Sequence, residues 1–240
     1  MAEELRFRRV LLKLSGEALL GSQSYGIDDA FVARIAAEIG EAVTLGVKVG
    51  IVVGGGNIFR GMSIAADGGN RVAGDHMGML ATVMNSIALH EGLERAGVPA
   101  RIYSAIAVPA ICETFTQQSA DAAMNSGRVV VFAGGTGNPF FTTDSGAALR
   151  AAEMGCDALF KGTNVDGVYS ADPKTDPDAK RYERLAYDEM LVRGLKVMDA
   201  AAVALARDNR IPLIVFSIHE PGAFVDILKG SGRATVVAER

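Results

Sequence analysis

Two lysines stand at the ends of short apolar segments, where a positive charge can meet a bound anion. Lys13 lies inside the segment Val10–Leu14, and Lys161 ends the segment 158–161. A lysine in an apolar strand must either reach a partner or be exposed. For both residues, a solvent-facing edge position and a position facing a ligand stay open. Two such lysines in one crevice would suit charge stabilisation during phosphoryl transfer.

Three expected strands end in glycine-rich turns, at Lys13 to Gly16, Gly54 to Asn57 and Gly134 to Asn138. Glycine lets backbone N–H groups come close to an anion, and a helix N-terminus after the turn adds a favourable dipole. Any one of these turns is more simply a structural strand-to-helix connection. Three of them at equivalent strand ends favour a site for phosphates, because ligands of open α/β sheets bind at this edge.

Three charged residues follow these turns. Arg60, shortly after the triple glycine, can bind a phosphate through two parallel hydrogen bonds or lie in solvent. Asp75 and Asp144 are each expected to open a helix, so an N-cap is their simplest role. Asp75 can also accept hydrogen bonds from two ribose hydroxyls, and Asp144 can also orient Mg²⁺ or the lysines.

The sequence does not contain the motifs that several other types of reaction require. The chain has no GxxxxGK[ST] motif, no GxGxxG turn with a following acidic residue and no protein-kinase catalytic loop. Ser15 has no evident His and Asp partners for hydrolysis. We expect no metal bound by the protein directly, because neither the histidines nor the cysteines have ligand spacing; these are His76, His90, His219, Cys112 and Cys156.

The composition of the 240 residues points to an ordinary globular protein. The formal net charge is −4, and no cluster of Lys and Arg marks a nucleic-acid surface. No apolar run reaches the ~18 residues of a membrane span, and the segment Met1–Arg9 has no signal-peptide core. We therefore expect a cytoplasmic protein that needs neither nucleic acid nor a membrane.

The elements that would position these residues alternate between strand and helix, which predicts a mainly parallel sheet covered on both faces. A helix is expected over Gly74–Ala96, with Met77, Met79 and Met84 interpreted as part of a core face. The polar segment Asn164–Tyr182 is interpreted as a surface excursion. Strands are expected at Val10–Leu14, Val47–Val53, Arg101–Ala105, Val129–Ala133, Ala158–Lys161 and Leu213–Phe216, with further helices at 29–45, Asp144–Met154, Tyr187–Arg193, Met198–Asp208 and after Pro221.

Six segments together resemble the bacterial UMP kinases of the amino-acid-kinase superfamily, from about Arg9 to Thr235. GDHMGMLATVMN and GTGNPFFTTDS are the specific ones; KLSG and GGG are shared more widely. The segments are LLKLSGEAL (Leu11 to Leu19), GGGNIFRG (Gly54 to Gly61), GDHMGMLATVMN (Gly74 to Asn85), GTGNPFFTTDS (Gly135 to Ser145), VDGVYSADP (Val165 to Pro173) and LKVMD (Leu195 to Asp199).

The resemblance implies a three-layer αβα sandwich around one mainly parallel sheet, a single domain over residues 1–240, and assembly as a homohexamer. The N-terminal part would mainly hold UMP and the C-terminal part ATP. The implied catalytic residues are Lys13, Asp144 and Lys161. The implied ATP-binding residues are Lys13, Leu14, Ser15, Gly16, Gly56, Arg60, Thr163, Asn164, Tyr169 and Asp172. The implied UMP-binding residues are Gly55, Arg60, Asp75, Thr136, Gly137, Asn138, Pro139, Phe140, Phe141, Thr142 and Thr143.

The implied reaction transfers the γ-phosphoryl group of ATP, with Mg²⁺, to UMP and gives UDP and ADP in de novo pyrimidine nucleotide synthesis. The nucleophile would be a phosphate oxygen that is already anionic, so no general base is needed. Lys13, Lys161, Arg60 and Mg²⁺ would offset the repulsion between two anions. The family also implies activation by GTP and inhibition by UTP. The loop linked to GTP in some relatives corresponds to Gly21, Ser22, Gln23, Ser24, Tyr25 and Gly26, which could equally be a plain surface loop.

Two alternatives remain at this point. Another kinase of the same fold could act on a carboxylate, a carbamate or an isoprenoid phosphate, although the residues after the triple glycine, Asn57 to Arg60, include no histidine of the isoprenoid-phosphate type. A non-catalytic protein is the second alternative, since molybdenum-storage proteins resemble UMP kinases and bind clusters. The presence of Lys13, Arg60, Asp75 and Asp144 favours catalysis.

Overall fold

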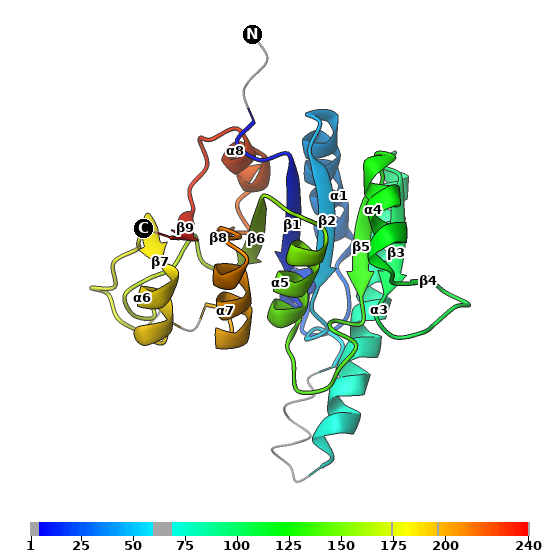
Figure 1. The fold of residues 1–240 in the computed structure, drawn as a ribbon, viewed down its shortest axis with the longest axis horizontal. Coiled ribbons are helices and arrows are strands. Elements are labelled where there is room, and N and C mark those ends of the chain that lie inside the picture. The colour runs from blue at the N-terminus through cyan, green and yellow to red at the C-terminus, as the bar shows by residue number, and fades with distance from the viewer. Residues whose placement is uncertain (1–4, 60–68, 174, 196, 240) are drawn as a thin grey trace.

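The computed structural model describes residues 5–59, 69–173, 175–195 and 197–239. Within these ranges the strands form one nine-stranded sheet in the order β4-β3-β5-β2-β1-β6-β8-β9-β7 (Figure 1). All neighbouring strands are parallel except β8 and β9. The strands are β1 (Arg9–Leu14), β2 (Lys48–Val53), β3 (Ala100–Ser104), β4 (Glu113–Thr114), β5 (Val129–Ala133), β6 (Ala158–Thr163), β7 (Arg184–Ala186), β8 (Leu213–Ser217) and β9 (Thr235–Ala238).

Helices cover both faces of this sheet, which makes the expected three layers (Figure 1). One layer contains α1 (Asp29–Thr44), α3 (Arg71–Arg95) and α8 (Ala223–Leu228). The other contains α4 (Gln117–Asn125), α5 (Thr143–Glu153), α6 (Tyr187–Val192) and α7 (Ala200–Asp208). A short 3-10 helix, η1 (Gly16–Leu20), follows β1 directly. The predicted fold class is therefore confirmed.

The alternation of side chains along β1 divides the core in two. Val10, Leu12 and Leu14 pack in the cluster beneath α1, α3 and α8, whereas Leu11 packs with α4, α5 and α7. Since successive side chains of a strand point to opposite faces, Lys13 lies on the α5 side together with Leu11. The alternation of side chains along β1 therefore directs Lys13 to the helix layer that contains α5.

Several predicted boundaries shift by one to three residues, and some short elements were missed. Val129–Ala133 is a strand as expected, and Asp28 caps α1 by accepting a hydrogen bond from Phe31 N–H at 2.8 Å. The helix expected from Gly74 begins earlier, at Arg71, with Asn70 as its N-cap. The strands β4, β7 and β9 were not predicted; each has four residues or fewer, too short for a clear period.

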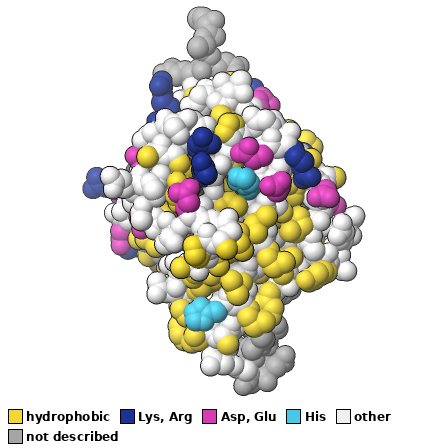
Figure 2. Space-filling model, turned by 90° about the vertical axis from the view of Figure 1, so that its right-hand side faces the viewer, with side chains coloured by type: hydrophobic (Ala, Val, Ile, Leu, Met, Phe, Trp, Pro, Cys, Tyr) yellow, Lys and Arg dark blue, Asp and Glu magenta, His cyan; other side chains and the backbone are white. Residues whose placement is uncertain are grey.

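The interpretation of the methionines as one core face is wrong for two of the three. Met79 is 6% exposed, but Met77 and Met84 are 45% and 50% exposed. Leu80, Ile87 and Ile111 are also exposed, and hydrophobic side chains gather on the side of the molecule that carries α3 and β4 (Figure 2). The helix is apolar on two sides. Only one of them faces the sheet, and the other stays exposed.

Candidate active site

The two lysines lie side by side on neighbouring central strands. Lys13 of β1 and Lys161 of β6 are register partners and are 7% and 8% exposed. Asp144, the second residue of α5, lies between them. Lys161 Nζ donates to Asp144 Oδ2 at 2.6 Å, and Lys13 Nζ forms an ion pair with Oδ1 at 2.8 Å. The edge-strand position that was open for Lys13 is therefore wrong, since β1 has a strand on each side.

Burial and charge act on this cluster in opposite directions. Burial alone would raise the pKa of the Asp144 carboxyl, but the charges of Lys13 and Lys161 outweigh it and lower that pKa below its ordinary value. Burial, followed by repulsion from Lys13, lowers the pKa of Lys161 to about 8, although Asp144 opposes the shift. Two lysines and one aspartate leave an excess positive charge, which suits an anion better than a cation.

The glycine-rich turns after β1, β2 and β5 lie at one edge, because these three strands are neighbours in the parallel sheet. The first two turns are in direct contact. A Cβ on Gly16 would lie 2.6 Å from the Gly54 carbonyl oxygen and 2.7 Å from the Gly56 nitrogen. Only glycine fits there without movement of the neighbouring turn. The chain thus brings two sets of backbone N–H groups beside Lys13.

A buried pair of asparagines holds the triple-glycine turn, and sequence reasoning gave them no role. Asn57 is 3% and Asn85 0% exposed. Each side-chain amide donates to the other's oxygen, at 3.0 Å and 2.6 Å. Asn85 Nδ2 also donates to the Gly54 carbonyl at 2.7 Å, and Asn57 Nδ2 to the Gly26 carbonyl at 2.8 Å. Buried amides require such partners, so the pair fixes the turn against α3.

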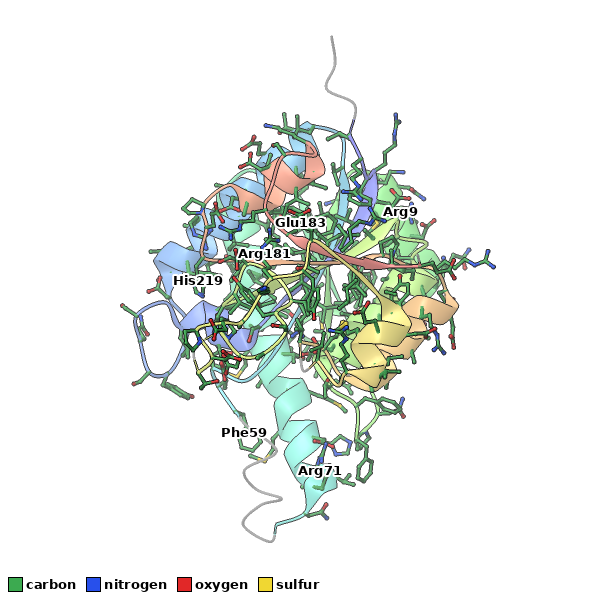
Figure 3. The ribbon with its side chains drawn as sticks, turned by 90° about the vertical axis from the view of Figure 1, so that its left-hand side faces the viewer. Arg9, Phe59, Arg71, Arg181, Glu183 and His219 are labelled. Atoms are coloured by element: carbon green, nitrogen blue, oxygen red, sulfur yellow. The ribbon has the colours of Figure 1, made fainter. Side chains whose placement is uncertain are left out.

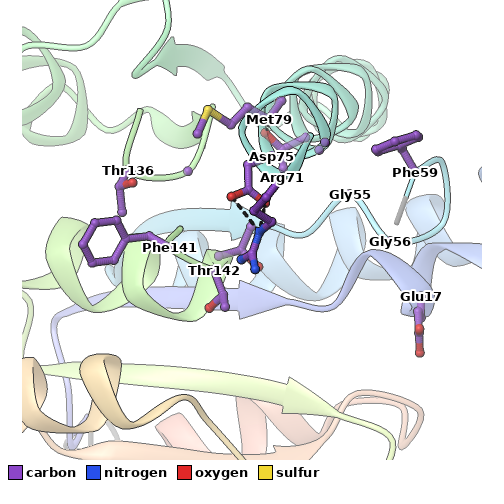
Figure 4. A pocket seen from close by; sticks show the side chains of 15 residues that line it. Glu17, Gly55, Gly56, Phe59, Arg71, Asp75, Met79, Thr136, Phe141 and Thr142 are labelled. Carbon is purple, nitrogen blue, oxygen red and sulfur yellow. Dashed lines mark hydrogen bonds and ion pairs between the residues drawn. The ribbon is translucent and has the colours of Figure 1, made fainter. Parts of the chain in front are cut away.

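A cavity of about 370 Å³, which we call the α3 cavity, opens between α3 and the loop after β5 (Figure 4). It brings together glycines of the triple turn, the first three turns of α3 and predicted residues at the start of α5. The predicted Gly137, Asn138, Pro139 and Phe140 lie in the same loop but do not line it. The lining residues are Glu17, Gly55, Gly56, Phe59, Arg71, Gly74, Asp75, Gly78, Met79, Thr82, Gly135, Thr136, Phe141, Thr142 and Thr143.

Neither aspartate is a helix N-cap, contrary to their simplest predicted role. Thr142 caps α5 through Asp144 N–H, which frees the Asp144 carboxylate for the lysines. Asp75 lies in the second turn of α3, and its side chain is 12% exposed. Its Oδ2 accepts a hydrogen bond from Phe140 N–H at 2.7 Å. Asp75 therefore joins α3 to the loop across the cavity.

Asp199 is a further, partly buried anchor that sequence reasoning missed. It caps α7 by accepting from Ala202 N–H at 2.7 Å. Thr142 Oγ1 donates to its Oδ2, and Ser145 Oγ lies 3.1 Å from both carboxylate oxygens. The segment LKVMD ends at this residue, and that was its only signal in the sequence. Asp199 therefore connects α7 to the start of α5, beside Lys161.

Two adjoining cavities lie on the other side of Lys161. The α6–α7 cavity, about 560 Å³, includes Asp144, Lys161 and Asp199. The β6-loop cavity, about 610 Å³, shares three lining residues with it, Gly194, Leu195 and Val197. It brings together four residues that were predicted to hold the nucleotide base and ribose: Thr163, Asn164, Tyr169 and Asp172.

The C-terminal strand β9 fastens the loop of this cavity. Thr235 is fully buried, and its hydroxyl accepts a hydrogen bond from Val168 N–H at 2.9 Å. Arg233 Nε forms an ion pair with Asp166 Oδ2 at 2.7 Å, and Tyr169 Oη donates to Asp166 Oδ1 at 2.6 Å. The segment Asn164–Tyr182, which was predicted to be a surface excursion, is thus held in place by Arg233 and Thr235.

The remaining predicted residues fall elsewhere. Leu14 ends β1 in the core, and Ser15 caps η1. The six residues Gly21 to Gly26 form the connection between η1 and α1 and line none of the cavities described above. Their link to the site is Gly26, which accepts from Asn57. Arg60 lies outside the described residues.

The described part of the chain contains neither a metal-binding cluster nor a membrane-spanning helix. No group of three or more His, Cys, Asp or Glu residues there could hold a metal ion. In the same residues, no helix combines the length and apolar character of a membrane span.

Comparison with known proteins agrees with this geometry. The model of the amino acid kinase family matches residues 8–217. The uridylate kinase of Mesorhizobium japonicum is 67% identical over 233 residues, 97% of each chain, and that of Bartonella henselae 61% over the full length of both. The crystal structure of UMP kinase from Bacillus anthracis matches with a TM-score of 0.93 at 38% identity, covering 97% of this chain and 96% of that one. The UMP kinase from Ureaplasma parvum matches with a TM-score of 0.92 at 38% identity, covering 98% and 100%. The chain therefore belongs to the amino acid kinase family and, within it, to the uridylate kinases.

Proposed function

We propose that this protein transfers the γ-phosphoryl group of ATP to UMP, forming UDP and ADP, as a step of pyrimidine nucleotide synthesis. The observation that carries the proposal is the Lys13–Asp144–Lys161 cluster with its excess positive charge, because Asp144 and Lys161 line the α6–α7 cavity and the residue before Asp144, Thr143, lines the α3 cavity. Two anionic substrates that enter from opposite sides would meet at this charge. Relatives named uridylate kinase support UMP as the acceptor.

The α3 cavity is assigned to UMP. Gly55 and Thr143 line its floor, where backbone N–H groups and a hydroxyl suit the acceptor phosphate. Asp75 lies in its wall and would accept from the ribose hydroxyls. The base would lie against the loop after β5, towards Thr136 and Phe141, with Asn138 and its neighbours enclosing it from outside. Arg60 is proposed to bind phosphate from the adjoining segment.

The two cavities beyond Lys161 are assigned to ATP. Its phosphates would lie between these cavities and the α3 cavity, against Lys13, Ser15, Gly16 and Gly56, where two turns pack together and Gly56 also lines the α3 cavity. Its base and ribose would extend into the β6-loop cavity, towards Thr163, Asn164, Tyr169 and Asp172. We further propose that the chain forms a single domain. Its N-terminal part would mainly hold the acceptor, and its C-terminal part would mainly hold the donor.

The chemistry required of the protein is alignment and charge cancellation. A UMP phosphate oxygen is already an anionic nucleophile, so no side chain has to remove a proton. Lys13 and Lys161 would stabilise the charge on the transferring group, and Asp144 keeps their two ammonium groups within 2.8 Å and 2.6 Å of a common carboxylate. Asp144 thus acts on the lysines rather than on the substrate.

The residues fit a Mg²⁺ ion that arrives with ATP. The described residues offer no cage of three carboxylates, and Asp144 is engaged by both lysines. Mg²⁺ in phosphoryl-transfer sites is commonly held by substrate phosphates and only one or two carboxylates. Bound in that way, the ion would cancel part of the phosphate charge.

We propose assembly as a homohexamer through the exposed apolar side of α3. Met77, Leu80 and Met84 are each 45–50% exposed there, and contiguous apolar patches of this kind mark interfaces. We also propose a cytoplasmic enzyme activated by GTP and inhibited by UTP. The Gly21–Gly26 connection would serve in the GTP response, since Gly26 is tied to the glycine turn through Asn57.

A coupled ADP-release assay tests the reaction. The purified protein is given ATP and Mg²⁺ with UMP, CMP, dTMP or no acceptor, each with and without GTP. A strong preference for UMP is expected, with a higher rate in the presence of GTP. Folded protein that transfers to none of these nucleotides would contradict the proposal and favour the non-catalytic alternative.

A further inference from the structure

Arg71 is a cavity residue to which sequence reasoning gave no role. It is the first residue of α3 and lines the α3 cavity. Its side chain is 36% exposed, whereas that of Asp75, one turn later, is 12% exposed. Figure 3 places it at the end of the molecule away from Arg9, on the same side as Phe59, and Figure 4 shows its side chain directed at Asp75.

Arg71, Asp75 and Phe140 form a closed three-way contact. Arg71 Nε lies 2.9 Å from both carboxylate oxygens of Asp75. Phe140 N–H donates to Asp75 Oδ2 at 2.7 Å, and the Arg71 guanidinium lies over the Phe140 ring, 5.6 Å from its centroid. Every member therefore contacts the other two, although they come from a helix and from a loop 65 residues later.

The loop side of this contact is strained. Phe140 has φ of +74°, a left-handed conformation that is unfavourable for a non-glycine residue. Its ring is 67% exposed, so burial of the ring does not stabilise this conformation. Phe140 is held in this conformation by the hydrogen bond from its N–H to Asp75 and by the Arg71 guanidinium over its ring. Arg71 therefore supports both the carboxylate and the loop that face the cavity.

We infer that Arg71 is a positioning residue that sets the preference for a ribose over a 2′-deoxyribose acceptor. This inference rests on the proposed function, in which Asp75 accepts from the two sugar hydroxyls of UMP. A carboxylate fixed on one side by Arg71 and Phe140 N–H has a defined orientation towards the cavity. Without Arg71 the carboxylate can turn, and its hydrogen bond to the 2′-hydroxyl loses strength.

The test is the ratio of kcat/KM for UMP to that for dUMP in wild type and in Arg71→Met. Hydrogen bonds to charged groups correspond to a factor of roughly ten or more in affinity, so the ratio is expected to fall about tenfold. The KM for UMP should rise by a similar factor, while the KM for ATP and the turnover at saturating UMP change less than about twofold. Arg71→Lys should restore part of the preference.

Arg34→Met is the matched control. Arg34 pairs with Glu38 one turn later at 2.6 Å and stacks on Phe31 at 5.0 Å, as Arg71 does with its own partners, but it lines none of the cavities described here. Its loss should leave the UMP to dUMP ratio unchanged. Thermal unfolding of both variants separates a change in stability from a change in preference.

A double-mutant cycle separates this inference from the proposed function. In Asp75→Asn, the further change Arg71→Met should have little additional effect on the ratio, because both act through one carboxylate. An unchanged ratio in Arg71→Met, or an equal loss for ATP and UMP, would overturn the positioning role. Wild-type protein that phosphorylates neither UMP nor dUMP would instead refute the proposed function itself.

Discussion

Lys161 offers a direct test of the charge cluster, because the protonation state of its amine should depend on whether phosphate is bound. Its pKa of about 8 in the ligand-free protein means that about half of the molecules carry a neutral Lys161 at pH 8. Nucleotide phosphates beside the lysine favour its charged form and should return its pKa towards the ordinary value of 10.5. Binding should then take up about 0.1 proton at pH 7, about 0.5 at pH 8 and about 0.9 at pH 9.

Isothermal titration calorimetry measures this uptake. A non-hydrolysable ATP analogue with Mg²⁺ is titrated at each pH in buffers of different ionisation enthalpy, and the dependence of the observed heat on the buffer gives the number of protons. Lys161→Arg is the control, since arginine stays protonated throughout this range. Equal heats in all buffers, or the same uptake in Lys161→Arg, would refute the assignment of the shifted group.

The same shift has a consequence for folding in the absence of ligand. Lys161 binds its proton less tightly in the folded protein than in the unfolded chain, so its protonation opposes folding. The difference between 10.5 and about 8 corresponds to roughly 3 kcal/mol below pH 8, and this penalty disappears as the pH rises towards 10.5. The contribution of Lys161 to the free energy of unfolding therefore increases with pH across this window.

Three further variants test the assigned roles by steady-state kinetics and thermal unfolding. Asp75→Asn should raise the KM for UMP about tenfold and leave that for ATP nearly unchanged; equal weakening of both would remove its role at the ribose. Lys13→Ala should lower turnover by about 10²–10³ with smaller changes in KM, and wild-type turnover would contradict charge stabilisation. Gly16→Ala would place a Cβ 2.6 Å from the Gly54 oxygen and 2.7 Å from the Gly56 nitrogen, so ATP binding should weaken and the unfolding free energy fall by about 1–3 kcal/mol; unchanged ATP affinity would show that the contact of the turns is dispensable.

The sequence was sufficient to predict six adjacent strands of the sheet, β3-β5-β2-β1-β6-β8, and its glycine-rich edge. Val47–Val53 and Val129–Ala133 are mostly apolar runs closed by glycines, and this pattern is typical of buried parallel strands. Local pattern could not predict that Lys13 and Lys161 become register partners, because that depends on the strand order β2-β1-β6. Nor could it place Asp144 between them, since its helix approaches from another part of the chain.

The errors at α3 have two physical sources. An amphipathic period shows which residues are apolar, and it does not show which apolar side meets the sheet. Met79 faces inwards and Met84 outwards on the same helix. The helix was also expected to begin at Gly74 and not at Arg71, which made Asp75 look like an N-cap and left Arg71 outside the expected helix. The N-cap Asn70 was the signal that would have corrected both.

Because β9 and the residue Arg233 before it hold the loop of the β6-loop cavity, loss of this segment should weaken binding of the donor nucleotide. Thr235 Oγ1 accepts from Val168 N–H, and Arg233 reaches Asp166, which in turn holds Tyr169. Loss of the segment from Arg233 onward would remove β9 from between β8 and β7 while leaving the central strands paired. Such a shortened chain should lose affinity for ATP more than for UMP, because neither Thr235 nor Arg233 lines the α3 cavity, so the intactness of this strand can be gauged by nucleotide binding.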